Sequence, residues 1–324
     1  MQAYAVIAPE KGKIDIDSQE LPPVGPGQVL IESHISTISP GTELAFLHHM
    51  PNTPGNYPMG FGYSSCGTIL EVGEEVEELS VGQRVVSRAP HATHVLMDAK
   101  LCFPVPDSIS DVDASVYRLG SIALQGVRKA QIQLGWSVAV LGLGPIGNLA
   151  AQISRATGAA QVVGIDPVEW RRDLAMSCGL DAVTNSAEML MDAPDYEGFE
   201  AVIEATGAPQ VVPSSFHLAK WRGHVVLLAS SRGETNNVNF YRDVHKKGLT
   251  IFGAHESTRA ASEDLFYLAT DRTDSLTVLK LLATKRIQTA PLVSDIVSFE
   301  EADTAYERLA NREEPLMTIA LRWK

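Results

Sequence analysis

The chain has 324 residues and a mass of 35.0 kDa, which at about 150 residues per domain is enough for two domains. With 45% hydrophobic and 20% charged residues, its composition is that of a folded globular protein and excludes a disordered or collagen-like chain. The formal net charge is −13, which argues against nucleic acid or an anionic membrane as a partner, because both attract clustered Lys and Arg. We therefore expect a small-molecule partner.

The three cysteines exclude some site types and suggest a compartment. Cys66, Cys102 and Cys178 are odd in number and far apart, so neither a disulfide framework nor a cysteine-rich zinc site fits. The first residues lack the basic and then apolar segments of a signal peptide. The longest apolar run, 138–153, is shorter than the ~20 residues that a membrane span needs. We expect a cytoplasmic protein with no membrane partner.

The chain begins with strands. Short apolar runs separated by Pro and Gly clusters, as at 22–27, are typical of strands joined by turns. This pattern continues to about residue 117 and predicts an all-β, barrel-like first part. The clearest expected strands are Ala3–Ile7, Gln28–Ser33, Gly67–Val72 and Arg84–Ser87.

From Leu119 to about Ala254, strands alternate with helix-compatible stretches, which indicates βαβ units and a parallel sheet. The remaining tail predicts two helices, 262–286 and 299–311, and a closing strand over 317–322 that packs back on the preceding domains. The fold class is therefore α/β, with a doubly wound parallel sheet beside a β-rich domain. The expected strands of the sheet are Ser137–Leu141, Gln161–Ile165, Ala201–Glu204 and His224–Ala229.

A glycine-rich motif follows the first strand of this sheet. The apolar residues 138–141 lead directly into Gly142-Leu143-Gly144-Pro145-Ile146-Gly147 and then into a helix. Gly142 permits a tight turn, Gly144 lets the main chain approach a pyrophosphate, and Gly147 lets helix and strand pack closely. The N-terminus of the helix would offer free N–H groups and partial positive charge to phosphates.

The second strand ends in Asp166, close to the ~20-residue offset at which an acidic residue binds the ribose hydroxyls. This predicts NAD rather than NADP. The alternative is an ordinary strand-to-helix turn in which Asp166 caps the next helix. Arg171 and Arg172 follow closely, and we interpret them as surface charges rather than as partners of a 2′-phosphate. The expected cofactor-binding residues are Gly142, Leu143, Gly144, Pro145, Ile146, Gly147, Asp166, Thr206, Gly207 and Ser230.

Together with the motifs at 67–73 (GTILEVG), 81–85 (VGQRV), 204–207 (EATG) and 299–302 (FEEA), these features resemble the medium-chain dehydrogenase/reductase superfamily over essentially the whole chain. The resemblance implies a GroES-like catalytic domain at 1–118, a Rossmann dinucleotide-binding domain at 119–258 and a β/α tail at 259–324. It indicates little about the substrate.

The zinc-dependent alcohol and polyol dehydrogenases of the superfamily that this chain resembles hold a catalytic zinc on three residues. The corresponding positions here are Pro40, Tyr63 and Arg118, and the four-cysteine loop of the structural zinc is missing. Since Pro, Tyr and Arg cannot form a zinc site, we expect no metal. The segment 39–43 (SPGTE) with Tyr63 resembles the zinc-less branch that includes the bacteriochlorophyllide-type dehydrogenases.

Without zinc, other groups must stabilise charge on the substrate oxygen. Arg118 could take over the role of the metal or bind a substrate carboxylate; the alternative is a salt bridge between domains, for example with Glu43. Tyr63 could act as the acid/base and pass its proton through Thr42, or it could merely fill the space of the metal. His49 or His91 is a further candidate for the general base; the alternative is that each is an ordinary polar loop residue. The expected catalytic residues are Thr42, Tyr63 and Arg118.

The sequence therefore predicts a metal-independent oxidoreductase that moves a hydride between NAD(H) and a secondary alcohol or ketone of a polyol-, sugar- or cyclic-alcohol-like substrate. The alternatives are a quinone or enoyl reductase, and a catalytically inactive nucleotide-binding or redox-sensing protein. The apolar segment Leu249–Gly253 would form an exposed sheet edge, and we expect it to pair in a homodimer.

Overall fold

The computed structural model describes residues 1–260 and 269–324, which divide into two compact units. Unit 1 comprises Met1–Leu119, Ser275–Ala283 and Leu292–Lys324, and unit 2 comprises Gly120–Asp274 and Thr284–Pro291. The tail after residue 258 thus contributes to both units. The first part of the helix expected over 262–286 lies outside the described residues, and the described part forms α8 (Asp271–Ala283).

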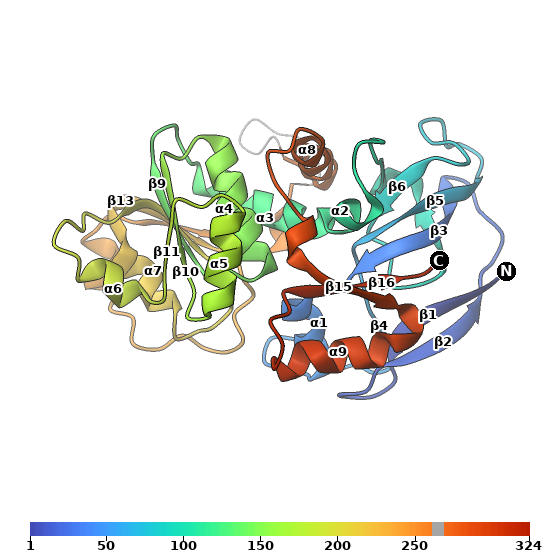
Figure 1. The fold of residues 1–324 in the computed structure, drawn as a ribbon, viewed down its shortest axis with the longest axis horizontal. Coiled ribbons are helices and arrows are strands. Elements are labelled where there is room, and N and C mark those ends of the chain that lie inside the picture. Colours follow the sequence, from blue (N-terminus) through green and yellow to red (C-terminus); the bar gives the residue numbers. More distant parts are fainter. Residues whose placement is uncertain (261–268) are drawn as a thin grey trace. The chain divides into compact units, whose positions relative to one another are not determined.

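Unit 1 is built on two β-sheets (Figure 1). One sheet has the order β2–β1–β4, and the other has the order β15–β16–β3–β5–β6–β8, with β7 also paired to β3. The strand β3 is ten residues long and mostly buried, because it pairs with β5, β7 and β16. The strands are β1 (Gln2–Ala8), β2 (Asp15–Glu20), β3 (Gln28–Thr37), β4 (Met59–Gly60), β5 (Ser65–Val72), β6 (Arg84–Ser87), β7 (His94–Asp98), β8 (Cys102–Pro104), β15 (Val293–Ser298) and β16 (Thr318–Arg322).

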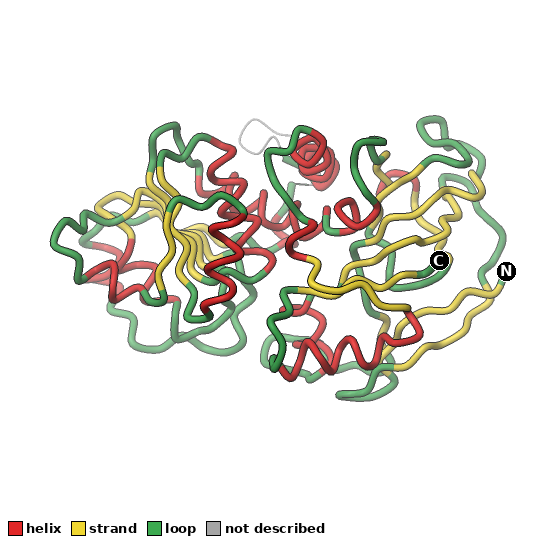
Figure 2. Tube along the Cα trace, in the orientation of Figure 1, coloured by secondary structure: helices red, strands yellow, loops and turns green. Residues whose placement is uncertain are grey.

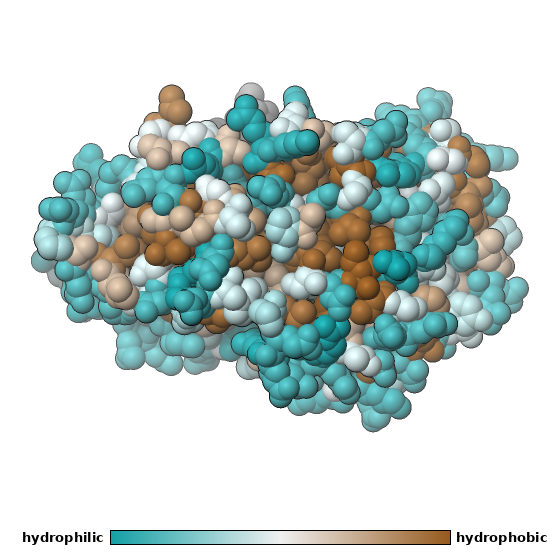
Figure 3. Space-filling view, in the orientation of Figure 1, coloured by the Kyte–Doolittle hydropathy of each residue, from teal (hydrophilic) through white to brown (hydrophobic). Residues whose placement is uncertain are grey.

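Three helices of unit 1 are α1 (Pro40–Leu47), α2 (Asp111–Ser115) and α9 (Ala302–Asn311). The helix α9 is amphipathic: Ala302, Ala305, Tyr306 and Leu309 are buried in the same cluster as residues of β1, α1 and β16. Its outer face carries hydrophilic side chains, as Figure 3 shows. This packing brings Tyr306, near the end of the chain, against the first fifty residues.

Unit 2 contains a parallel sheet with the strand order β11–β10–β9–β12–β13–β14, and helices lie on both of its faces (Figure 2). The order reverses between β9 and β12, which confirms the expected doubly wound sheet; in such sheets ligands bind at the carboxyl ends of the strands near this reversal. The elements are β9 (Ser137–Leu141), α4 (Pro145–Thr157), β10 (Gln161–Ile165), α5 (Glu169–Ser177), β11 (Ala182–Thr184), α6 (Ala187–Met191), β12 (Phe199–Glu204), α7 (Val212–Leu218), β13 (Ala219–Leu227) and β14 (Thr250–Gly253).

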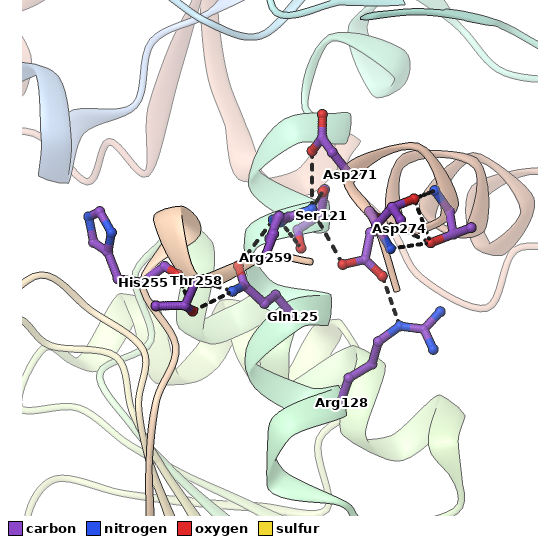
Figure 4. A network of polar contacts seen from close by, with 10 residues as sticks. Ser121, Gln125, Arg128, His255, Thr258, Arg259, Asp271 and Asp274 are labelled. Atoms are coloured by element: carbon purple, nitrogen blue, oxygen red, sulfur yellow. Dashed lines mark hydrogen bonds and ion pairs between the residues drawn. The ribbon is translucent and has the colours of Figure 1, made fainter. Parts of the chain in front are cut away.

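A polar network within unit 2 joins the helix α3 (Tyr117–Ala130) to residues 255–259 and to the first turn of α8 (Figure 4). The guanidinium of Arg259 donates to Ser121 Oγ at 2.8 Å and to Gln125 Oε1 at 3.1 Å. The carboxylate of Asp274, which is almost fully buried, lies 3.3 Å from Arg259 and accepts from Arg128 Nε at 2.8 Å. Two cations thus compensate one buried charge, as a buried carboxylate requires.

The described part of the chain contains neither a disulfide bond nor a helix that could span a membrane. Cys66, Cys102 and Cys178 are buried free thiols, and burial raises the pKa of Cys102 to about 12. Among residues 1–260 and 269–324, no helix is both long and apolar enough to cross a membrane.

Candidate functional site

The glycine-rich loop of unit 2 is closely packed on one side and open on the other. Gly142 has φ = 85°, and a Cβ there would lie 3.0 Å from the backbone N of Thr206. A Cβ on Gly147 would lie 1.8 Å from the carbonyl oxygen of Gly142, so helix α4 could not pack on the loop with any other residue. In contrast, a Cβ on Gly144 meets nothing within 4 Å. The loop is therefore open where a ligand would approach the main chain.

The helix α4 begins directly at this open side. Gly144 is its N-cap, Pro145 is at its first turn and the helix is 13 residues long. The first N–H groups of a helix have no partner within the helix, and they carry partial positive charge. Together with the open loop, this N-terminus has the chemistry that binds the pyrophosphate of a dinucleotide.

The side chain of Asp166 lies at the carboxyl end of β10 and contacts the same loop. Its Oδ2 accepts the backbone N–H of Leu143 at 2.8 Å, and its Oδ1 accepts the N–H of Val168 at 2.9 Å. Arg172 donates to the carbonyl oxygen of Asp166 at 2.7 Å, and Arg171 Nη1 lies 3.8 Å from the carboxylate. The interpretation of these two arginines as plain surface charges was therefore wrong, because both are half-buried against Asp166.

The other expected cofactor residues lie beside the loop. A Cβ on Gly207 would lie 3.0 Å from the carbonyl oxygen of Ser230, so the segments after β12 and β13 are in contact. The side chains of Thr206 and Ser230 are exposed. All these residues follow the carboxyl ends of strands, where a doubly wound sheet binds its ligands.

The three expected catalytic residues belong to unit 1. Thr42 is in α1 and is half-buried, Tyr63 is half-buried between β4 and β5, and Arg118, at the start of α3, is fully buried. Ser64 joins two of their segments: its hydroxyl accepts the N–H of Arg118 at 3.3 Å and donates to the carbonyl oxygen of Ser115 at 2.5 Å. The residue next to Tyr63 is thereby bound to the start of the helix that carries Arg118.

A buried carboxylate lies immediately after Thr42. Glu43 Oε1 accepts the backbone N–H of Ser39 at 2.7 Å, and its Oε2 is 3.1 Å from His91 Nε2 and accepts the hydroxyl of Tyr306. Glu43, His91 and Tyr306 are each at most 2% exposed. The partners of the Glu43 carboxylate are thus the backbone of Ser39, His91 and Tyr306. A salt bridge with Arg118 was the partner suggested by the sequence.

Both ring nitrogens of His91 have a hydrogen-bond partner. Trp323 Nε1 can only donate, and it donates to Ser36 Oγ at 2.8 Å. The hydroxyl of Ser36 can then donate to His91 Nδ1, which is 2.7 Å away. On the other side of the ring, Nε2 lies 3.1 Å from Glu43 Oε2. His91 is thus a fully buried member of this network, although it lies in the loop before β7.

Tyr306 is the residue of this network that sequence reasoning missed. It lies in α9, far along the chain from Glu43, and no motif or spacing connects them. Burial raises the pKa of Tyr306 well above its usual range, and the charges of Glu43 and Tyr63 add to this effect. The phenol therefore stays protonated and acts as a donor. The electrostatic interaction between Tyr306 and Tyr63 indicates that Tyr63 lies near the buried network.

The residues at the three metal positions do not fit zinc. They are Pro40, Tyr63 and Arg118, and zinc requires thiolate, imidazole or carboxylate ligands. Among residues 1–260 and 269–324, no group of three or more His, Cys, Asp or Glu side chains is placed to hold a metal ion. Glu43, three residues after Pro40, and His91 are both engaged in the network described above.

Comparisons with known proteins identify the family. Residues 25–107 match the family model of the alcohol dehydrogenase GroES-like domain, and residues 145–271 match that of the zinc-binding dehydrogenases. D-xylulose reductase of Saccharomyces cerevisiae is 24% identical, over 97% of this chain and 96% of its own length.

Two solved structures share the fold. Galactitol-1-phosphate dehydrogenase from Escherichia coli has a TM-score of 0.86 and 20% identity, covering 98% of this chain and 99% of its own. An alcohol dehydrogenase from Escherichia coli CFT073, in complex with NADH, has a TM-score of 0.85 and 19% identity, with 99% of both chains covered.

The two family models together match well over half of the chain. The glycine-rich loop at 142–147, together with Asp166, has the geometry of a dinucleotide site. The chain belongs to the medium-chain dehydrogenase/reductase superfamily, of the zinc-type alcohol dehydrogenase-like kind, and is a nicotinamide-dependent dehydrogenase or reductase.

Proposed function

We propose that this protein is a metal-independent dehydrogenase that moves a hydride between NAD(H) and a secondary alcohol or ketone of a polyol, sugar or cyclic alcohol. One observation carries the proposal. The chain has an open glycine-rich loop bound to Asp166, and it has Pro40, Tyr63 and Arg118 at the three positions that correspond to the zinc ligands of related enzymes. The similarity to proteins named D-xylulose reductase and galactitol-1-phosphate dehydrogenase supports the polyol class.

The groups of unit 1 would handle the oxygen of the substrate. When an alcohol is oxidised, the hydrogen on carbon leaves as hydride to the nicotinamide, and the hydroxyl proton must pass to the protein. Arg118 has a fixed fork of donors that would stabilise the alkoxide-like oxygen. Tyr63 would take the proton and Thr42 would pass it to solvent. The buried network of Glu43 holds α1, and with it Thr42, in place.

The proposal is tested by product analysis and elemental analysis of the purified protein. We expect oxidation of a C–OH group with formation of NADH on a panel of polyols, sugars and cyclic alcohols, with no stoichiometric metal and no effect of chelation. One zinc per chain, lost together with activity, would contradict metal independence. Reduction of a C=C bond would identify a quinone or enoyl reductase, and tight NADH binding without turnover would identify a sensor.

Asp166 should set the choice between NADH and NADPH. Its carboxylate can accept hydrogen bonds from ribose hydroxyls but repels a 2′-phosphate, so we expect NADH to bind at least about tenfold more tightly. Asp166→Asn keeps an acceptor for the Leu143 N–H and removes the charge, so it should narrow this difference. Asp166→Ala should narrow it too and also weaken NADH. Fluorescence titration measures both affinities, and a wild-type preference for NADPH would contradict the assignment.

Arg118 should contribute to turnover more than to cofactor binding. If its guanidinium stabilises the developing oxyanion, Arg118→Met should lower kcat by about 10²–10³-fold, as the loss of an oxyanion donor does. Arg118→Lys keeps the charge without the fork and should be intermediate, and NADH affinity should stay near that of the wild type in both. A Met variant that turns over normally but melts earlier would show that Arg118 is structural.

A homodimer is the proposed assembly. The strand β14 is the outer strand of the unit 2 sheet, and Thr250, Ile251 and Gly253 on it are exposed. An unpaired edge of this kind is a site for pairing with a second copy. Light scattering at micromolar concentration should give twice the chain mass, and replacing Ile251 by Lys should shift the mass towards the monomer. A monomeric wild-type protein would contradict this expectation.

The cytoplasm is the proposed compartment. The support is that Cys66, Cys102 and Cys178 are free thiols, the usual state of cysteines in a reducing compartment.

A further inference from the structure

A buried carboxylate lies at the reversal point of the unit 2 sheet. Glu204 is the last residue of β12, where it is paired with Leu141 of β9 on one side and with Leu227 of β13 on the other. It is 0% exposed. The neighbouring strands end in leucine at this level, so the sheet itself does not require a carboxylate here. Burying such a group is costly unless hydrogen bonds compensate it.

The hydrogen bonds of Glu204 go to a single turn. Its Oε1 accepts the backbone N–H of Thr206 at 2.7 Å and also the hydroxyl of Thr206. The Oγ1 of Thr206 in turn accepts the N–H of Ala208 at 3.0 Å. Among the described residues, the other oxygen of Glu204, Oε2, is buried without a hydrogen-bond partner. Burial raises the pKa of Glu204, and hydrogen bonds from Thr206 and from the backbone of Gly207 oppose part of that rise.

This turn forms the wall of the glycine-rich loop. The N and Cα of Thr206 lie 3.0 Å from the position of a Cβ on Gly142. Ala205 donates its N–H to the carbonyl oxygen of Leu141 at 2.8 Å, and its Cβ lies 3.3 Å from the position of a Cβ on Gly147. The glycines at both ends of the motif are thus packed against residues 205 and 206, whose conformation is held by Glu204.

We propose that Glu204 is a positioning residue of the dinucleotide site, which holds Thr206 against Gly142 so that the loop keeps the shape that binds the pyrophosphate. The inference rests on the proposed function in one respect, since it takes the ligand of the loop to be NADH. The hydrogen bonds of Glu204 go to Thr206, so Glu204 acts through that residue. Thr206 is exposed, and its Cγ2 lies 2.9 Å from the position of a Cβ on Gly142.

The test compares NADH affinity with thermal stability in matched variants. Glu204→Leu removes both acceptor bonds but matches Leu141 and Leu227 in the neighbouring strands, so the Kd for NADH should rise about ten- to hundredfold while Tm stays near that of the wild type. Glu204→Gln retains an acceptor oxygen and should restore most of the affinity. The control is Glu200→Ala, in the same strand, which removes the acceptors for Ser137 and Lys220 and should lower Tm without changing the Kd.

A double-mutant cycle separates positioning from direct contact. Thr206→Val removes the hydroxyl, and its effect on the NADH Kd should largely disappear in the Glu204→Leu background, because the two groups act as one unit. Normal NADH binding by Glu204→Leu, or fully additive effects with Thr206→Val, would overturn the positioning role alone. If Glu204→Leu does not fold, unchanged binding by Thr206→Val overturns it. A wild-type protein that binds neither NADH nor NADPH overturns both this role and the proposed function.

Discussion

Unit 2 depends on one steric constraint, the absence of space for a side chain at Gly142. The carbonyl oxygen of Gly142 lies only 1.8 Å from the position of a Cβ on Gly147, and the backbone of Thr206 lies 3.0 Å from the position of a Cβ on Gly142. Because the turn is this tight, α4 starts directly at the carboxyl end of β9 and directs its N–H groups to the open side at Gly144. The position of the phosphate-binding groups therefore follows from packing rather than from any charged side chain.

Each unit contains a buried carboxylate that is compensated by nearby donors. Glu43 in unit 1 is bound by a backbone N–H, a histidine and a tyrosine, and Glu204 in unit 2 is bound by the backbone and hydroxyl of Thr206. Leaving such a group without one of its donors costs about 1–3 kcal/mol, so each network restrains the segments that supply the donors. These segments carry the residues assigned to catalysis and to cofactor binding.

The sequence predicted local patterns better than contacts between distant segments. The strands Ser137–Leu141 and Gln161–Ile165 occur with the predicted bounds, because short apolar runs followed by glycine or aspartate define buried parallel strands. The expected roles of Gly142 and Gly147 follow from the same local signal, and the structure agrees with them. The contact of Arg172 with Asp166 was missed because one turn of α5 brings the arginine back over the strand end, a geometry that composition does not reveal.

The network of Glu43 was outside the reach of sequence reasoning for a different reason. Its members come from β3, α1, the loop before β7, α9 and the end of the chain, and each of them alone has an ordinary structural interpretation. Only the packing of α9 against α1 brings Tyr306 to Glu43, and amphipathic periodicity predicts that α9 is buried on one face without predicting its partner.

The same network would give the metal-independent site that we propose a defined geometry. A zinc ion would organise its ligands by direct bonds, whereas Thr42 and Tyr63 must be held by the protein around them. Two donors of this network come from the last part of the chain. Tyr306 donates to the carboxylate of Glu43, next to Thr42, and Trp323 donates to the hydroxyl of Ser36. The C-terminal helix α9 and the residues after β16 therefore do more than pack on the sheet of unit 1. They also supply donors that hold the segment carrying Thr42.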